Sequence, residues 1–243
     1  MGLRLLCVVA HPDDECFAFG GALALASDQG LETHVICLTD GRAAKNRGAA
    51  QSATELGQMR RAEFSASCEV LGVSHYELWD YEDGRLEFAN FSHTAGSLVA
   101  KMREIKPDVV LTFGSDGAVN THPDHSMVSA FTSNAFHWAA SATRYPELGP
   151  IHHAKRLFHQ TTSFFIEGRP APMPAPWTVT LDVRTVMVRK HEACRQHRSQ
   201  APLMEQTKDL FERLGHTEHY VLAGSSEVGP ARQITSLFEG ITG

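Results

Sequence analysis

An imidazole and three carboxylates follow a short apolar run near the beginning of the chain, where residues 10–15 read Ala-His-Pro-Asp-Asp-Glu. His11 and Asp14 are three residues apart, so one turn can offer a nitrogen and an oxygen ligand to a divalent metal. At least one carboxylate of the motif, which also contains Asp13 and Glu15, would then remain free. The alternative is an ordinary strand-to-helix turn in which the acidic residues cap the following helix.

A second polar motif occupies residues 121–125, Thr-His-Pro-Asp-His, after the apolar run 109–113 and a glycine-containing loop. His-x-x-His spacing alone is a weak indication of a metal site. Catalytic zinc keeps three protein ligands and an open position for water, which two ligands from one turn and a third from another would supply. Because both motifs follow a predicted strand, together they favour a catalytic metal site over two helix caps.

Strand-like and helix-like patterns alternate along most of the chain. Strands are predicted at the start of the chain up to the first motif and at residues 31–38, 76–79, 109–113, 157–166 and 178–183. Helices are predicted at residues 17–29, 56–71, 92–105, 126–142, 185–198 and 203–214. This order predicts an α/β fold: a Rossmann-like, mostly parallel sheet with helices on both faces and right-handed crossovers. Both motifs would lie at the carboxyl edge of the sheet, where ligands bind.

The length of 243 residues and the 42% apolar composition predict a single domain over residues 1–243. From about residue 150 the chain is expected to add strands and helices to this same domain. The proline-rich stretch 168–176 is interpreted as a loop rather than a domain boundary. Residues 41–55 are interpreted as a mobile loop over the site, and the pattern weakens after residue 215.

Charge and composition exclude several classes of function. The formal net charge is −6 and no basic run occurs, which argues against nucleic acid and anionic membranes as partners. No run reaches the ~18 apolar residues of a membrane span, and the start of the chain lacks a signal-peptide pattern. The five cysteines form no C-x-x-C pair, so a reducing cytoplasm is expected rather than a disulfide framework or a thiolate metal site. Motifs for dinucleotides, nucleoside triphosphates and serine hydrolases are absent.

The two polar motifs together resemble the LmbE-like (PIG-L) family of zinc-dependent de-N-acetylases, which remove acetyl groups from N-acetylglucosamine-type sugars. Shorter signatures support the resemblance over about residues 3 to 215: Thr39-Asp40-Gly41, Arg60 and Glu63 before Leu71-Gly72, and Lys190 leading to His197-Arg198-Ser199-Gln200. The resemblance implies an LmbE-like fold and a small N-acetylated sugar as substrate. It also implies a homo-oligomer, since family members often form trimers or hexamers.

The resemblance assigns the metal ligands. His11, Asp14 and His125 would hold one Zn²⁺, with water at the open positions. Iron(II) would suit the same ligands, because sites without thiolate discriminate weakly between these metals.

The same resemblance assigns roles beside the metal. Asp13 would take a proton from the attacking water as general base. His122 would stabilise the tetrahedral oxyanion or act as an acid, and Asp124 would orient His122 through a hydrogen bond.

Substrate contacts are predicted less directly. Arg60, Asp40 and Asp83 are the candidates for binding the part of the substrate away from the acetamide. For Arg60 the alternative is a solvated helix face or a surface ion pair, and for the acidic turn 80–84 it is an ordinary Asp-Gly turn. His197 is either a donor to the oxyanion or a histidine at a helix C-terminus facing the helix dipole.

The sequence therefore predicts a metal-dependent hydrolase that removes an N-acetyl group from a small, water-soluble N-acetylglucosaminide. Two alternatives remain open. One is an amidase of a thiol conjugate or another acylated amine, and the other is an inactive relative that binds a sugar or a metal. The particular substrate, the metal in the cell and the oligomeric state are left undecided by the sequence.

Overall fold

The computed structural model describes residues 2–165, 170–229 and 232–242. Within these residues, seven strands form one sheet in the order β3-β2-β1-β4-β5-β7-β6. The first five strands are parallel, and β7 is antiparallel to both of its neighbours. The strands are β1 Arg4–Val9, β2 Glu32–Thr39, β3 His75–Tyr81, β4 Val109–Phe113, β5 Arg156–Thr161, β6 Val179–Asp182 and β7 Thr217–Ser225. The predicted α/β fold with a mostly parallel sheet is confirmed.

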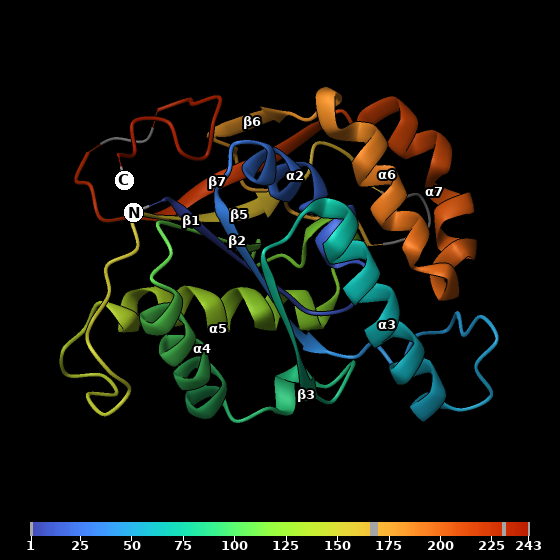
Figure 1. Cartoon of the computed structure of the whole chain (residues 1–243), viewed down its shortest axis with the longest axis horizontal. Coiled ribbons are helices and arrows are strands. Elements are labelled where there is room, and N and C mark those ends of the chain that lie inside the picture. Colours follow the sequence, from blue (N-terminus) through green and yellow to red (C-terminus); the bar gives the residue numbers. More distant parts are fainter. Residues whose placement is uncertain (1, 166–169, 230–231, 243) are drawn as a thin grey trace.

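Helices cover both faces of the sheet (Figure 1). The α4–α5 pair covers one face, and α2, α3 and α6 cover the other. The helices are α1 Asp14–Phe17, α2 Gly20–Asp28, α3 Ala53–Leu71, α4 Phe91–Ile105, α5 Pro123–Ala139, α6 Met187–Gln196 and α7 Ala201–Leu214. Short 3₁₀ turns lie at η1 Leu86–Phe88, η2 Ala118–Asn120, η3 Arg184–Val186 and η4 Arg198–Gln200. Among the described helices, none combines the length and apolar character needed to cross a bilayer.

Strand β1 separates the two hydrophobic cores. Its side chains alternate, so that Leu5, Cys7 and Val9 pack into one core while Leu6 and Val8 pack into the other. Alternation with burial on both faces explains why this strand reads as a continuous apolar run. The polar motif begins directly where β1 ends, and it therefore lies at the carboxyl edge of the sheet.

Local signals fix the ends of several helices. The Ser52 hydroxyl accepts a hydrogen bond from the backbone of Glu55 at the start of α3. At the other end, α3 stops at Leu71, and the next residue, Gly72, has a φ of 77°. The side chain of His122 caps α5, and Pro123 occupies the first turn. Ser at the start of a helix, Pro in its first turn and Gly after its end are favoured at helix boundaries.

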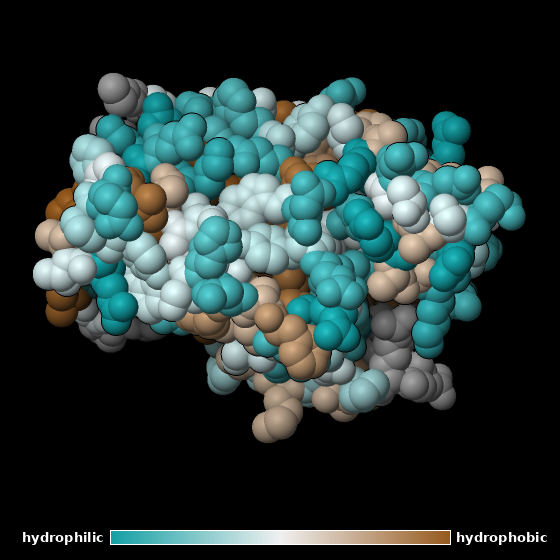
Figure 2. Space-filling view, turned by 90° about the horizontal axis from the view of Figure 1, so that it is seen from below, coloured by the Kyte–Doolittle hydropathy of each residue, from teal (hydrophilic) through white to brown (hydrophobic). Residues whose placement is uncertain are grey.

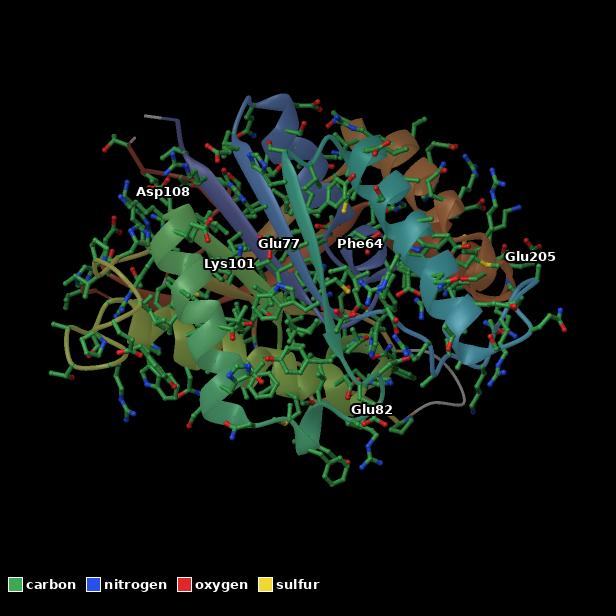
Figure 3. All side chains as sticks on the ribbon, turned by 60° about the horizontal axis from the view of Figure 1, so that its bottom comes forward. Phe64, Glu77, Glu82, Lys101, Asp108 and Glu205 are labelled. Atoms are coloured by element: carbon green, nitrogen blue, oxygen red, sulfur yellow. The ribbon has the colours of Figure 1, made fainter. Side chains whose placement is uncertain are left out.

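A charged contact joins α4 to strand β3. Lys101 of α4 donates to Glu77 of β3 at 2.6 Å, and Figure 3 shows the two side chains close together.

Some predicted boundaries are wrong. The predicted helix 17–29 is wrong at its start. Helix α1 ends at Phe17 and α2 begins at Gly20, because the backbone of Phe19 is not helical and its side chain is fully buried. The predicted helix 126–142 begins at Pro123 and ends at Ala139. The strand predicted at 157–166 ends at Thr161, and residue 166 lies outside the described residues. Residues 168 and 169 of the predicted loop also lie outside them.

Strand β7 contradicts the expectation that regular structure weakens after residue 215. Its buried positions include Glu218, a charged residue that interrupts the apolar pattern by which a strand is recognised. Glu218 is satisfied in the structure by the Lys190 ammonium at 2.6 Å and by the Tyr220 hydroxyl at 2.6 Å. We propose that residues 1–243 form one domain, because one core joins residues from both halves of the chain, including Leu5 and Tyr220.

Most of the surface seen in Figure 2 is hydrophilic. Hydrophobic residues on this face occur in small groups separated by polar side chains. Isolated exposed apolar residues of this kind are ordinary for a folded domain.

Candidate metal centre

Two turns at neighbouring strands supply the centre. His11 and Asp14 lie in the turn after β1, and His125 lies in the first turn of α5, which follows β4. Strands β1 and β4 pair directly. From this pair the sheet continues to β2 on the β1 side and to β5 on the β4 side, so the strand order reverses here. Such a reversal is where ligands bind in open α/β sheets.

Asp14 lies between two imidazole rings. Its Oδ2 atom is 3.5 Å from His11 Nδ1, and its Oδ1 atom is 3.1 Å from His125 Nε2. All three residues are buried, and their ligand atoms lie within 4.8 Å of one another. The structure therefore brings together the three residues predicted as metal ligands.

The outward-facing nitrogen of each imidazole has its own acceptor. His11 Nε2 lies 3.1 Å from Asp124 Oδ2 and 3.2 Å from Asp83 Oδ1. His125 Nδ1 lies 3.1 Å from the carbonyl oxygen of Gly117. With a proton on each outward-facing nitrogen, the other nitrogen of each ring would be free to bind a cation beside Asp14, as in metal-binding histidines. Without an ion, burial would lower the pKa of His11, but Asp124, Asp14 and Asp83 raise it well above its ordinary value.

One buried nitrogen in this centre lacks a partner. Among the residues that the structure describes, His125 Nε2 makes no hydrogen bond, although Asp14 Oδ1 is near, because the two atoms are poorly aligned. An unsatisfied buried polar atom costs free energy, and a cation between the ring and the carboxylate would remove that cost. Two imidazole nitrogens and one carboxylate oxygen fit a divalent ion such as zinc or iron(II).

Asp14 is held as an anion. Burial would raise its pKa, but His125 and His11 lower it well below its ordinary value. Its Oδ2 atom also accepts backbone N–H bonds from His11 at 2.8 Å and from Ala10 at 3.2 Å. These bonds close the turn after β1 and fix the carboxylate between the rings.

Asp13 has an unusual backbone conformation, with a φ of 107°. This region disfavours side chains other than glycine and costs on the order of 1–3 kcal/mol, so the surroundings must hold it. The Asp13 N–H donates to Glu15 Oε2 at 2.8 Å, and Arg60 Nη2 donates to Asp13 Oδ2 at 2.9 Å and to the Pro12 carbonyl. Burial raises the pKa of Asp13 to about 6, although the Arg60 charge opposes this shift.

Arg60 is buried at the base of the turn rather than exposed on a helix surface. Its Nη1 atom donates to the Gly41 carbonyl at 2.9 Å. Gly41 has a φ of 67°, and a Cβ atom there would lie 2.1 Å from the guanidinium, so only glycine fits this close approach. The alternative of a solvated helix face is wrong for Arg60. Its assignment to the remote part of a substrate stays a prediction, whereas its contacts hold Asp13.

A supporting layer lies beneath Asp13 and was not predicted. Glu15, which accepts the Asp13 N–H, also accepts from the Ser67 hydroxyl at 2.5 Å and lies 2.6 Å from His197 Nε2. Burial would lower the pKa of His197, but Glu15 raises it above its ordinary value. His197 is fully buried at the end of α6, so its geometry fits support of Glu15 better than contact with an oxyanion. Its substrate role stays a prediction.

His122 lies beside the ligands. Its Nδ1 atom accepts the backbone N–H of Asp124 at 3.1 Å, and its ring meets the His11 ring edge-on at 4.6 Å. Burial, together with His11 and His125, lowers the pKa of His122 to about 4. The ring is therefore neutral near pH 7 and, with Nδ1 accepting, carries its proton on Nε2.

Asp124 makes contacts beyond the one predicted with His122, and its role in orienting that ring stays a prediction. Its carboxylate does not bond the His122 ring but instead accepts from Gly84 N at 2.8 Å, from Leu86 N at 3.1 Å and from His11 Nε2. Only its backbone N–H contacts His122. Asp124 therefore orients a predicted metal ligand, and sequence spacing could not reveal this because two of the partners lie about 40 residues earlier in the chain.

The other two predicted substrate contacts differ in position. Asp83 lines the cavity over the centre and accepts the backbone N–H of Ala43 at 2.6 Å, which ties the loop after β2 to the site. Asp40 is buried and ion-paired with Arg42 and Arg61, and it is not among the described residues that line this cavity. Its substrate role stays a prediction.

A polar cavity of about 800 Å³ opens over the centre. This volume lies within the usual range for binding sites of small organic ligands. Its described lining combines the centre with residues of the loop after β2 and of α7, namely His11, Asp13, Asp14, Ala43, Ala44, Lys45, Asn46, Arg60, Asp83, Gly84, Asn120, His122, His125, Pro170, Gln200, Leu203 and Gln206.

The fold and the centre define a protein of the α/β class with a buried polar site at the carboxyl edge of its sheet. The chain belongs to the family described as GlcNAc-PI de-N-acetylase (PIG-L), whose model matches residues 6–136. The resemblance stated from the two His-Pro-Asp motifs is confirmed.

Individual relatives agree with this assignment. A protein of Bacillus cereus named "Probable N-acetyl-alpha-D-glucosaminyl L-malate deacetylase 2" is 30% identical over 84% of this chain and 86% of its own length. A mycothiol S-conjugate amidase of Streptomyces coelicolor is 32% identical over 60% of this chain and 55% of its own length. The N,N'-diacetylchitobiose deacetylase of Pyrococcus horikoshii shares the fold, with a TM-score of 0.75 and 22% identity over 98% of this chain and 86% of that one.

Proposed function

We propose that this enzyme hydrolyses the acetamide of a small N-acetylglucosaminide and depends on a divalent metal held by His11, Asp14 and His125. The observation that carries the proposal is the buried His125 Nε2 atom, which lies 3.1 Å from Asp14 without making a well-aligned hydrogen bond and belongs to a cluster of three possible ligand atoms. Family membership and the deacetylase relatives support the reaction. When bound, the ion supplies Lewis acidity to the amide carbonyl and to the attacking water.

Asp13 is the general base in this proposal. It lies beside Asp14 but is bound by Arg60 rather than by an imidazole, so it remains free of the metal. A pKa of about 6 allows it to accept a proton from water near neutral pH and to return that proton to the leaving amine.

His122 stabilises the oxyanion. Its neutral ring lines the cavity and carries its proton on Nε2, because Nδ1 accepts from the backbone. A neutral donor held by an N-cap hydrogen bond is preorganised for the charge that develops on the carbonyl oxygen. Of the two roles predicted from the sequence, oxyanion stabilisation suits this ring better than proton delivery.

The proposal is tested with a panel of N-acetylglucosamine derivatives that differ only in the group attached to the sugar. Free amine, released acetate and bound metal are measured for the purified full chain. Metal near one equivalent, equal release of amine and acetate, and loss of turnover on chelation with recovery on adding metal are the expected results. Metal bound to the centre without hydrolysis of any member would overturn the proposal.

A second candidate function is hydrolysis of an amide with a larger acyl group. The amidase relative motivates this candidate. Release of a larger acid in preference to acetate would favour it. Zinc rather than iron(II), a homo-oligomeric state and a cytoplasmic location also remain predictions.

A further inference from the structure

A second, apolar pocket of about 120 Å³ adjoins the centre. It shares Asp13, Asp14, Asn120, His125 and Leu203 with the polar cavity, so the two spaces meet at two of the predicted ligands, Asp14 and His125. Its described lining is otherwise mostly apolar and comes from the end of α1, the end of β4, η2, α7, and β5 with the loop after it. These residues are Phe17, Ala18, Phe113, Ala118, Val119, Phe164, Leu203 and Phe211, together with Asn120, Gln160, Thr162 and Thr207.

Aromatic rings form the wall of this pocket from the centre outward. The Phe113 ring is parallel to the His125 ring, with centroids 3.9 Å apart. Farther out, the Phe211 ring of α7 packs against Phe17 at 5.3 Å and Phe164 at 6.3 Å. The pocket therefore begins at a predicted metal ligand and continues away from it between apolar side chains.

The difference in polarity decides how an amide lies across the centre. Sugar hydroxyls require hydrogen-bond partners when they leave water, and the cavity that contains Lys45, Arg60 and Asp83 supplies them. An acyl chain has no hydrogen-bonding groups that would need partners in the aromatic pocket, and its transfer there removes apolar surface from water. The carbonyl carbon at the junction then points its substituent toward Phe113, and the amine side points into the polar cavity.

The size of the pocket exceeds what an acetyl group fills. An apolar cavity of about 150 Å³ holds a benzene ring, so by the same measure 120 Å³ holds roughly four carbon atoms beyond the carbonyl, whereas acetyl has one. We infer that this pocket is an acyl-binding subsite and that the enzyme hydrolyses N-acyl sugars with chains up to about five carbons in total. In each case water adds to the carbonyl carbon, the C–N bond breaks, and a carboxylic acid and a free amine are formed. This inference rests on the proposed hydrolase function.

The test uses glucosamines acylated with acetyl, propanoyl, butanoyl, pentanoyl and octanoyl groups, and the readout is free amine from the metal-loaded full chain. The expected result is a kcat/KM for pentanoyl within about tenfold of that for acetyl or above it, and a sharp fall at octanoyl. A loss of tenfold or more for each added carbon, starting at propanoyl, would overturn the inference.

Two variants change the pocket in opposite directions. Ala18→Leu fills it and is expected to reduce kcat/KM for pentanoyl at least tenfold more than for acetyl. Phe211→Ala enlarges it and is expected to raise kcat/KM for octanoyl. Ala44→Leu is the matched control, because Ala44 lines the polar cavity only, and its effect should be equal for all chain lengths. Equal responses to chain length in all three variants would contradict an acyl subsite.

A binding measurement separates this inference from the proposed function. Acetohydroxamate and pentanohydroxamate carry the same metal-binding group, so the difference between their affinities reports on the chain alone. Calorimetry should give at least tenfold tighter binding of pentanohydroxamate, and Ala18→Leu should abolish the difference. This result without turnover of any amide would overturn the hydrolase proposal but support the subsite, whereas equal affinities would overturn the subsite even in an active deacetylase.

Discussion

Asp13 and Asp14 are adjacent carboxylates with opposite environments. Imidazole rings on both sides lower the pKa of Asp14, while burial raises the pKa of Asp13 despite the nearby Arg60. Two carboxylates whose pKa values are driven apart can perform different tasks in one site. The left-handed backbone at Asp13 makes this division possible, because it turns the two neighbouring side chains toward different partners.

Replacing Asp13 by Asn should separate chemistry from metal binding. Asn retains an oxygen for Arg60 but cannot take a proton from water, so kcat should fall by about 10²- to 10⁴-fold. Elemental analysis should find the same metal content as in the unchanged protein. Asp14→Asn is the control and should lose metal. A fully active Asp13→Asn enzyme would exclude this residue as the base.

Replacing Asp124 by Asn tests whether this carboxylate acts through His11. Loss of the negative acceptor at His11 Nε2 should weaken metal binding by about 10- to 100-fold, as for other partners of metal-binding histidines. Metal titration of the stripped protein gives this value, and kcat at saturating metal should be less affected. Asp108→Asn, at the far end of β4, serves as control. Unchanged metal affinity in Asp124→Asn would refute the orienting role.

At the scale of elements, the buried Glu218 of β7 joins three parts of the fold. It accepts the Gly21 N–H at 2.7 Å and the Ala22 N–H at 3.0 Å at the start of α2, and it pairs with Lys190 of α6. A Cβ atom on Gly21 would lie 2.6 Å from the Glu218 carboxylate, so glycine is required at this contact. One carboxylate thus caps a helix and neutralises a buried ammonium.

Glu218→Ala should destabilise the protein strongly, because Lys190 would remain buried without a counter-charge. Removal of one partner from a buried pair typically costs about 3–5 kcal/mol of unfolding free energy. Urea denaturation should show this loss, and Lys190→Met in the Glu218→Gln background should recover part of it. Asp182→Ala, which breaks an exposed pair with Arg184, should have little effect. Equal stability of both single variants would contradict the account.

The sequence predicts the elements whose local pattern agrees with their environment. Strand β4 is predicted at its observed bounds because all five of its residues are buried and apolar or β-branched. Strand β7 is not predicted, because the charge of Glu218 interrupts the apolar pattern. Its burial depends on contacts such as the one with Gly21, which lies almost 200 residues away in the chain. The same limit applies to the site. Ligand spacing within a turn indicates His11, Asp14 and His125, whereas the contact of Glu15 with His197 spans 182 residues.

At the scale of the whole molecule, His159 makes folding sensitive to acid. Burial lowers the pKa of this β5 histidine from 6.5 to about 4, and its ring lies 2.9 Å from the Ser133 hydroxyl. The unfolded chain therefore binds a proton at a higher pH than the folded protein does. Stability is fully present above about pH 6.5 and falls as the pH decreases toward 4.

Replacing His159 by Gln should flatten this dependence. The unfolding free energy of the unchanged protein should decrease between pH 6.5 and pH 4 by on the order of 2–3 kcal/mol more than that of the variant. Denaturant midpoints measured across this range provide the comparison, and the slope rather than the absolute stability is the readout. Parallel curves for the two proteins would show that His159 is protonated equally in both states.

The reversal of strand order at the β1–β4 pair has a consequence for protein synthesis. His11 and Asp14 leave the ribosome more than a hundred residues before His125, and they meet it only when β4 has paired with β1. A nascent chain that ends before residue 125 contains two of the three predicted ligands but lacks His125. The predicted metal centre would thus be completed by tertiary folding, so that a protein able to retain an ion there would already have assembled the middle of its sheet.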